Sequence, residues 1–359
     1  YTANVYLHVV KNYNVDGIHL DYSRYAGVGW GYNPVSVARY NARYGATGMP
    51  SPDDPVWAQW RREQTAGLVR KIYLKAIAVK PHLKVSSAVI TWGDGPVADS
   101  DWEKSRAFAD VCQDWQGWLK EGIIDMVMPM NYFNEWDVTQ QTWYNKWIEY
   151  EKDHQNGRQI IIGPGIFSGY LEQSLDQIRR AQAPSALGNY ASGVCLFAYG
   201  ASHIYSNSDF KEHSSSKSLP RQPHVFAPEL NGLFYSLLSN DFDMVNGYLM
   251  GTVSESGGTS NDHIKIMVTQ IPKTGNPNEV PFYREIYTDG SGWYGLTEIP
   301  PGGYRVTIAG EGLAGERTRE VMILPGRVAE ADFRNVPASN LAASERKNYA
   351  DRINRIKSD

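Results

Sequence analysis

The sequence predicts an α/β domain with a parallel sheet, followed by a small all-β sandwich. In residues 1–212, short apolar runs alternate with segments whose apolar residues recur at the helical period. Strands that alternate with helices form parallel sheets through right-handed crossovers. In residues 246–335, short apolar runs are instead separated by Gly, Pro, Asn and Asp turns, which is typical of a sandwich.

The α/β region contains five predicted strands and five predicted helices. The strands are Gly17–Asp21, Lys84–Ile90, Asp125–Asn131, Gln159–Gly163 and Gly193–Tyr199. The helices are Val35–Tyr44, Val56–Lys80, Trp102–Lys120, Gln140–Asp153 and Leu175–Ala183. A closed (β/α) barrel needs about eight strands. Because residues 1–10 read as the end of an amphipathic helix, we expect an upstream segment or a partner chain to supply the missing strands.

The remaining elements follow from the same patterns. Residues 213–245 read as a linker with a short helix at Leu230–Leu238, and residues 336–359 read as a charged tail. The sandwich strands are predicted at Tyr248–Ser254, Ile264–Gln270, Glu285–Thr288, Tyr304–Ala309 and Glu320–Leu324.

Composition excludes several classes of function. The net charge of −4 contains no basic run that could neutralise a nucleic-acid backbone, and no apolar stretch is long enough to span a membrane. No metal-ligand spacing and no phosphate-binding or dinucleotide motif occurs, so we expect no metal and no cofactor. The two cysteines, Cys112 and Cys195, are predicted to be free thiols. The 11 Trp and 23 Tyr residues instead suit the flat apolar faces of sugars.

Asp21 is the first candidate for a catalytic residue. It ends an apolar strand, and barrel enzymes carry their active sites where strands end. Strand alternation places His19 one layer below Asp21 on the same face, and Arg24 and Tyr25 follow in the next loop. The alternative is that Asp21 caps this loop or pairs with Arg24.

Two further strand ends supply candidates. Glycoside hydrolysis normally needs two carboxyl groups, one protonated and one ionised. The second carboxylate is predicted to be Glu135 or Asp94, with Asp137 or an acid on the missing segment as alternatives. The residues predicted to hold sugar are His19, Arg24, Tyr25, Trp92, Tyr132, Trp136 and Tyr199.

These segments resemble the glycosyl hydrolase-like family 10 proteins of bacteria. The matching pieces are Tyr13–Tyr22, Trp57–Arg62, Lys80–Val89, Gln113–Trp115 and Pro129–Tyr132. The resemblance covers about residues 1–205 and implies a (β/α)8 TIM barrel in which Gly17–Asp21 is the fourth strand. This chain would then hold strands four to eight.

The second region resembles the carboxypeptidase-regulatory or prealbumin-like sandwiches. Thr288–Gly295 and Ile299–Val306 carry the resemblance, through an Asp-Gly-x-Gly turn and a Pro-Gly-Gly-Tyr strand start. Together the two resemblances imply a secreted, periplasmic or cell-surface glycosidase acting on a cell-wall or extracellular polysaccharide that contains amino sugars. The alternatives are a carbohydrate-binding protein without activity and a structural component of a cell-surface assembly.

Overall fold

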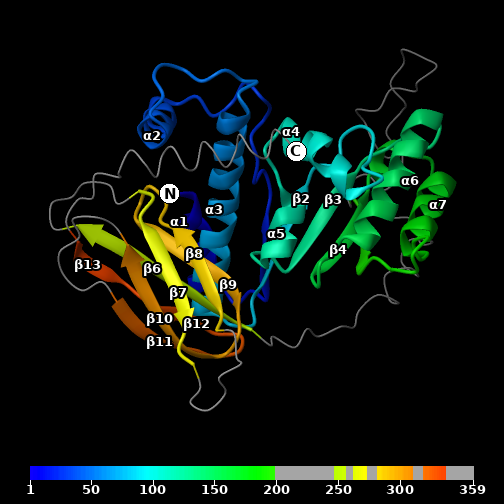
Figure 1. Ribbon diagram of the computed structural model, residues 1–359. Helices are drawn as coiled ribbons and strands as arrows, with labels where there is room; N and C mark the ends of the chain where they lie inside the picture. Colours follow the sequence, from blue (N-terminus) through cyan, green and yellow to red (C-terminus); the bar gives the residue numbers. More distant parts are fainter. Residues whose placement is uncertain (199–245, 256–261, 273–280, 310–317, 337–359) are drawn as a thin grey trace.

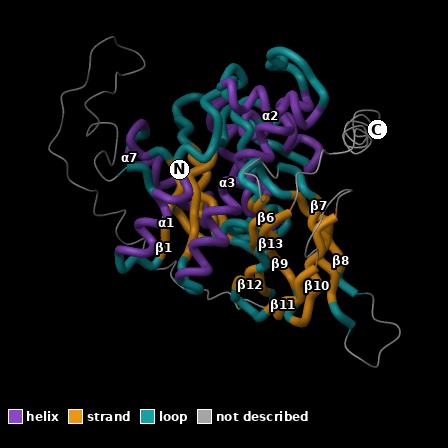
Figure 2. Tube along the Cα trace, turned by 90° about the vertical axis from the view of Figure 1, so that its left-hand side faces the viewer, coloured by secondary structure: helices purple, strands orange, loops and turns teal. Residues whose placement is uncertain are grey.

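The computed structural model describes residues 1–198, 246–255, 262–272, 281–309 and 318–336. An α/β unit and a β-sandwich lie on either side of the long helix α3, Pro55–Val79 (Figure 1). In the turned view of Figure 2, the sandwich strands gather on one side of α3, and α1 and β1 lie on the other. The predicted linker, the short helix within it and the charged tail from residue 337 onward lie outside the described residues.

The α/β unit is built on a parallel sheet of five strands in the order β1-β2-β3-β4-β5. The strands are β1 Gly17–Leu20, β2 Lys84–Val89, β3 Met126–Asn131, β4 Gln159–Pro164 and β5 Gly193–Val194. The main helices are α1 Thr2–Asn12, α2 Pro34–Tyr44, α3, α6 Val138–Asp153 and α7 Leu171–Gln182. The parallel α/β arrangement is therefore confirmed. Within the described residues the sheet is open rather than closed into a barrel, with β1 and β5 at its edges.

The predicted helix Trp102–Lys120 is wrong. The structure breaks it into a 3-10 helix, Asp99–Lys104, and two short helices, α4 Arg106–Ala109 and α5 Trp115–Glu121. Ser105 and Asp114 start α4 and α5, because their side chains accept hydrogen bonds from the backbone N–H groups of Phe108 and Gly117. Between them, Cys112 has a φ of 54°, which no continuous helix allows.

The last predicted strand, Gly193–Tyr199, is much shorter than expected. Only Gly193–Val194 pairs regularly with β4, and Phe197 adds a single bridge to Gly165. Tyr199 lies outside the described residues.

The two faces of the α/β sheet differ in their covering. One face buries Leu20, Val85, Val127 and Ile160 against the helices, in a core that includes Trp147 of α6. The opposite face carries the alternate residues, and among these His19 and Asp21 are exposed whereas Met128 and Met130 are half-buried. Helices therefore pack on one face, and the other face is open in the part of the chain that is described.

The sandwich contains two four-stranded sheets around its own apolar core. One sheet has the order β11-β10-β7-β8, and in the other β6 pairs with β9, β12 and β13. The strands are β6 Gly247–Glu255, β7 Lys265–Gln270, β8 Tyr283–Tyr287, β9 Trp293–Ile299, β10 Gly302–Ala309, β11 Thr318–Ile323, β12 Val328–Glu330 and β13 Phe333–Val336. The sequence patterns missed β9, β12 and β13, because β9 follows directly on the Asp-Gly-x-Gly turn and the other two are short.

The sandwich and the α/β unit share a core. Tyr248, Met250 and Trp293 of the sandwich belong to the same buried cluster as the α/β helices and strands. Helix α3 contacts β6, β9 and β12, and Gly295 lets β9 approach Leu74 closely. The contact therefore combines a shared apolar core with ion pairs between Lys71 and Asp289 and between Arg158 and Glu298.

Candidate functional site

Asp21 follows β1 directly, at the carboxyl end of the sheet. Its carboxylate is exposed, and its Oδ1 accepts a hydrogen bond of 2.7 Å from the backbone N–H of Tyr22. No ion pair among the described residues uses Asp21, so the predicted alternative of pairing with Arg24 is not seen. A charged oxygen thus faces the open side of the sheet.

His19 lies one layer below Asp21 on the same face, as strand alternation predicts. Its Nδ1 is 2.8 Å from the hydroxyl of Ser86 on β2. Burial lowers the pKa of His19, and the negative charge of Asp21 partly offsets this. His19 and Asp21 are therefore electrostatic neighbours. Because burial has the larger effect on the pKa of His19, the neutral imidazole is favoured.

Tyr132 follows β3 and faces the same open side as Asp21. Burial raises the pKa of its hydroxyl to about 12, with smaller contributions from Cys195 and from the charge of Asp21. The ring stacks on Phe197, with 5.2 Å between ring centroids, and meets Phe167 edge-on at 5.6 Å. Phe197 is 51% exposed. The hydroxyl of Tyr132 therefore stays protonated over the biological pH range and can donate a hydrogen bond.

Phe167 and Phe197 were missed in the sequence. Both follow the carboxyl ends of strands, β4 and β5 respectively, which is the one signal that was available. They enlarge the aromatic surface beside Tyr132.

The loops after β1 and β2 meet through a cation–π contact between Arg24 and Trp92. The guanidinium of Arg24 lies 4.1 Å from the ring centre of Tyr22 and 5.3 Å from that of Trp92. Arg106 lies 5.2 Å from the same Trp92 ring. The structure thus brings Arg24 and Trp92 together at this end of the sheet, with Asp21 in the loop that carries Arg24.

The other predicted carboxylates are engaged elsewhere. The side chain of Glu135 is 5% exposed and lies 2.5 Å from Arg180. It also accepts hydrogen bonds from Gln141 and Gln177. Asp94 pairs with Lys146 at 2.8 Å, and Asp137 caps α6 by accepting from the backbone of Thr139. These contacts turn all three carboxylates toward α6 and α7.

Two other predicted sugar-binding residues, Tyr25 and Trp136, are in the loops that follow β1 and β3. The backbone N–H of Tyr25 donates to the carbonyl of Val111, and its ring lies 5.7 Å from the guanidinium of Arg61. Burial raises the pKa of Tyr25 to about 12. Trp136 is half-buried in the loop that precedes α6. Tyr25 shows no contact with Asp21 or Tyr132 among the interactions that the structure describes.

The described ranges hold neither a set of grouped metal ligands nor a helix suited to cross a membrane. They contain no group of three His, Cys, Asp or Glu side chains arranged to hold a metal ion. None of the described helices combines the length and the apolar character that crossing a membrane requires. Cys112 and Cys195 are free thiols, as predicted.

Comparisons with known proteins agree with the α/β unit. The family model described as glycosyl hydrolase-like 10 matches residues 1–181. A protein named glycosyl hydrolase YngK, from Bacillus subtilis strain 168, is 29% identical over 148 residues, which are 38% of this chain and 28% of that relative. The chain thus spans less than a third of the curated relative that it matches.

Two solved structures show weak likenesses to this chain. The Bacillus anthracis TIE protein shares 19% identity at a TM-score of 0.20, over 25% of this chain and 16% of that one. A streptococcal ancillary pilin shares 15% identity at a TM-score of 0.22, over 26% of this chain and 33% of the pilin. Scores this low assign neither a fold nor an activity.

Proposed function

The chain belongs to the glycosyl hydrolase-like 10 family, and from this membership we propose that it is a glycoside hydrolase in which Asp21 is a catalytic carboxylate. The substrate that we propose is a cell-wall or extracellular polysaccharide containing amino sugars. Such a substrate places the protein in the secreted, periplasmic or cell-surface compartment. The exposed ring of Phe197, the ring of Tyr132 stacked on it and the half-buried ring of Trp92 supply apolar surfaces suited to sugar faces.

The observation that carries this proposal is the state of Asp21. Of the four carboxylates that the sequence predicted, Asp21 alone makes no hydrogen bond or ion pair with another side chain among the described contacts. A carboxylate that attacks a sugar, activates a water or protonates a leaving group must be accessible to substrate. Asp94, Asp137 and Glu135 are held by Lys146, Gln140 and Arg180 respectively.

The neighbours of Asp21 have supporting roles in this proposal. The hydroxyl of Tyr132, kept protonated by its raised pKa, donates a hydrogen bond to a sugar oxygen. Arg24, held over Tyr22, orients the substrate through its remaining N–H groups. His19 fixes the floor of the site through Ser86.

The second carboxyl group is proposed to come from outside the described sheet. The open face beside Asp21 and the edge of β1 are where the interior and the preceding strand of a TIM barrel would lie. An unpaired strand edge is normally covered. We therefore propose that a further segment or a partner chain completes the barrel here and brings an acid opposite Asp21.

The test is hydrolysis by the native protein and by Asp21→Asn, with Asp94→Asn as the matched control. The substrates are poly-N-acetylglucosamine and peptide-free peptidoglycan glycan, and the readout is newly formed reducing ends. Asparagine keeps the shape of the side chain and removes its acid–base and nucleophilic roles. We expect Asp21→Asn to lose at least about a hundredfold in rate, and Asp94→Asn to retain activity.

Two outcomes would count against the proposal. If Asp21→Asn cleaves as fast as the native protein, Asp21 is not catalytic. If neither protein cleaves and both bind the glycan, the site is a carbohydrate-binding site without activity.

A further inference from the structure

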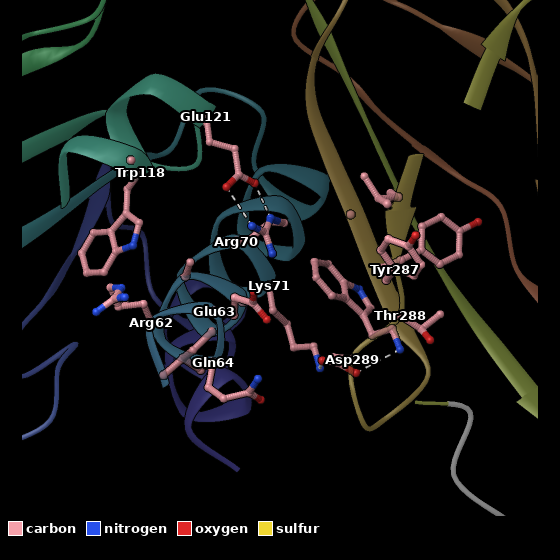
Figure 3. Close-up of a pocket in the computed structure, with 18 of the residues that line it drawn as sticks. Arg62, Glu63, Gln64, Arg70, Lys71, Trp118, Glu121, Tyr287, Thr288 and Asp289 are labelled. Carbon is pink, nitrogen blue, oxygen red and sulfur yellow. Dashed lines mark hydrogen bonds and ion pairs between the residues drawn. The ribbon is translucent and has the colours of Figure 1, made fainter. Parts of the chain in front are cut away.

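A pocket of about 650 Å³ lies where the α/β unit meets the sandwich, and Asp21 is not among the residues that line it. Helices α3 and α5 form one wall, and β8, β9 and the segment that connects them form the other. Figure 3 shows Arg62 and Trp118 on the α/β side, opposite Tyr287, Thr288 and Asp289 of the sandwich. Pockets of this size hold small organic ligands.

Gly67 keeps this pocket open. It lies in the middle of α3, where glycine is less favourable than alanine. Close packing is the usual reason for a glycine inside a helix, but a Cβ built on Gly67 would meet no atom within 4 Å. Packing therefore does not require glycine here. A side chain at this position would project into the cavity, so the glycine preserves empty volume.

The charges that line the pocket balance. The lining cations are Arg43, Arg62, Arg70 and Lys71, and the lining carboxylates are Glu63, Asp114, Glu121 and Asp289. Arg70 pairs with Glu121, Lys71 pairs with Asp289 at 2.6 Å, and Arg43 lies 3.5 Å from Glu63. Four positive and four negative groups leave no net charge, which favours a neutral occupant.

Polar atoms that remain available are both donors and acceptors. Arg62 donates to the Gln59 side chain and to the Phe108 carbonyl, and no carboxylate among the described residues pairs with it. The indole N–H of Trp118, a side chain that is 1% exposed, has no acceptor in the structure described. Asp114 accepts both of its described side-chain hydrogen bonds at Oδ1, from Trp102 and Gly117. Oδ2 is thus an acceptor for a ligand.

We propose that this pocket is an accessory binding site for a neutral sugar unit. Hydroxyl groups both donate and accept, which matches an arginine, an indole N–H and a carboxylate oxygen brought together on one wall. Tyr287, which is 39% exposed, offers an aromatic surface on the other wall. Asp21 does not line this pocket. The choice of a sugar as occupant rests on the proposed function, because the pocket and the site at Asp21 would contact the same glycan.

The pocket is tested in the full-length Asp21→Asn variant, so that no probe is cleaved. The probes are the trimer of N-acetylglucosamine and, as the charged comparison, the trimer of galacturonic acid. The readout is the indole N–H resonance of Trp118 in a nitrogen–proton correlation spectrum, assigned by its loss in Trp118→Phe. We expect the neutral trimer to shift this resonance in a saturable way and the acidic trimer to bind at least tenfold more weakly.

Gly67→Phe and Gly67→Ala form the matched pair of variants. Phenylalanine fills the cavity, whereas alanine adds one methyl group to open space. We expect Gly67→Phe to abolish the shift and Gly67→Ala to retain it, and Arg62→Gln to weaken binding about tenfold. The proposal is overturned if the Trp118 resonance does not respond to the neutral trimer, or if Gly67→Phe binds as tightly as Gly67→Ala. Neither result depends on whether Asp21 supports hydrolysis.

Discussion

Replacing Glu151 with glutamine should remove a pH dependence from the stability of the α/β unit. Glu151 lies on α6 with 0% exposure, and its Oε2 accepts a hydrogen bond of 2.8 Å from Asn131 at the end of β3. Burial raises the pKa of Glu151 well above its usual range, against smaller effects of Asn131 and Lys152. The ammonium of Lys152 bonds instead to Glu149 and to the carbonyl of Arg180. The hydroxyl of Tyr144 is a further electrostatic neighbour.

The sign and size of the effect follow from proton linkage. An unfolded glutamate titrates near pH 4.3, roughly. Between that value and the higher pKa of folded Glu151, the folded state binds one proton more than the unfolded state. The free energy of unfolding therefore falls as pH rises through this window. Each pH unit should lower it by about 1.4 kcal/mol relative to the glutamine variant, which is a tenfold change in the unfolding constant.

The assay is urea unfolding of the native protein and Glu151→Gln at three pH values between about 5 and 7. Glutamine has nearly the same volume and can still accept from Asn131, so the fold is expected to persist. Glu149→Gln is the control, because Glu149 is on the same helix but its side chain is 43% exposed. If the difference in free energy of unfolding between the native protein and Glu151→Gln does not change with pH, Glu151 is not a protonated, neutral acid in the folded state.

Two further substitutions test other parts of the structure. Asp54 caps α3 by accepting from the backbone of Val56 and Trp57, so Asp54→Ala should lower the free energy of unfolding by about 1 kcal/mol in urea titrations, whereas Asp53→Ala next to it should have little effect. Glu135→Gln removes the charge that holds Arg180; it should cost about 1–3 kcal/mol of stability while folded protein keeps its hydrolytic rate. Loss of hydrolysis in well-folded Glu135→Gln would instead make Glu135 the catalytic carboxylate.

The strands of the α/β unit were predictable because each carries its own signal. Met126–Asn131 is a largely apolar run of strand length, and Lys84–Val89 has the same length with apolar residues at Val85, Ala88 and Val89. Both strands lie within one residue of the predicted ends. The segment around Cys112 was not predictable in this way. Its apolar residues follow a helical period, but Ser105 and Asp114 divert the backbone into separate short helices. Side-chain caps of this kind compete with periodicity, and the pattern alone does not show which one wins.

The sequence predicted the candidate site only for residues whose position along a strand determines which face of the sheet they occupy. Asp21, His19 and Tyr132 share the open face because alternation along a strand is geometric. The roles of Glu135 and Asp94 depend on partners that are far away in sequence. Arg180 lies 45 residues after Glu135 and Lys146 lies 52 residues after Asp94, and nothing local to either acid indicates these contacts. Long-range pairing therefore set the limit of the sequence argument.

The shared core of Tyr248, Met250 and Trp293 with α3 changes how the two regions can be recombined. Sandwich modules are usually treated as interchangeable units joined at a linker. Here a cut between residues 198 and 246 would leave apolar side chains on both cut surfaces without their partners. Any chimera would have to transplant the matching face of α3 together with the sandwich. Helix α3 and the sandwich are therefore expected to be exchanged as one unit, both in evolution and in protein engineering.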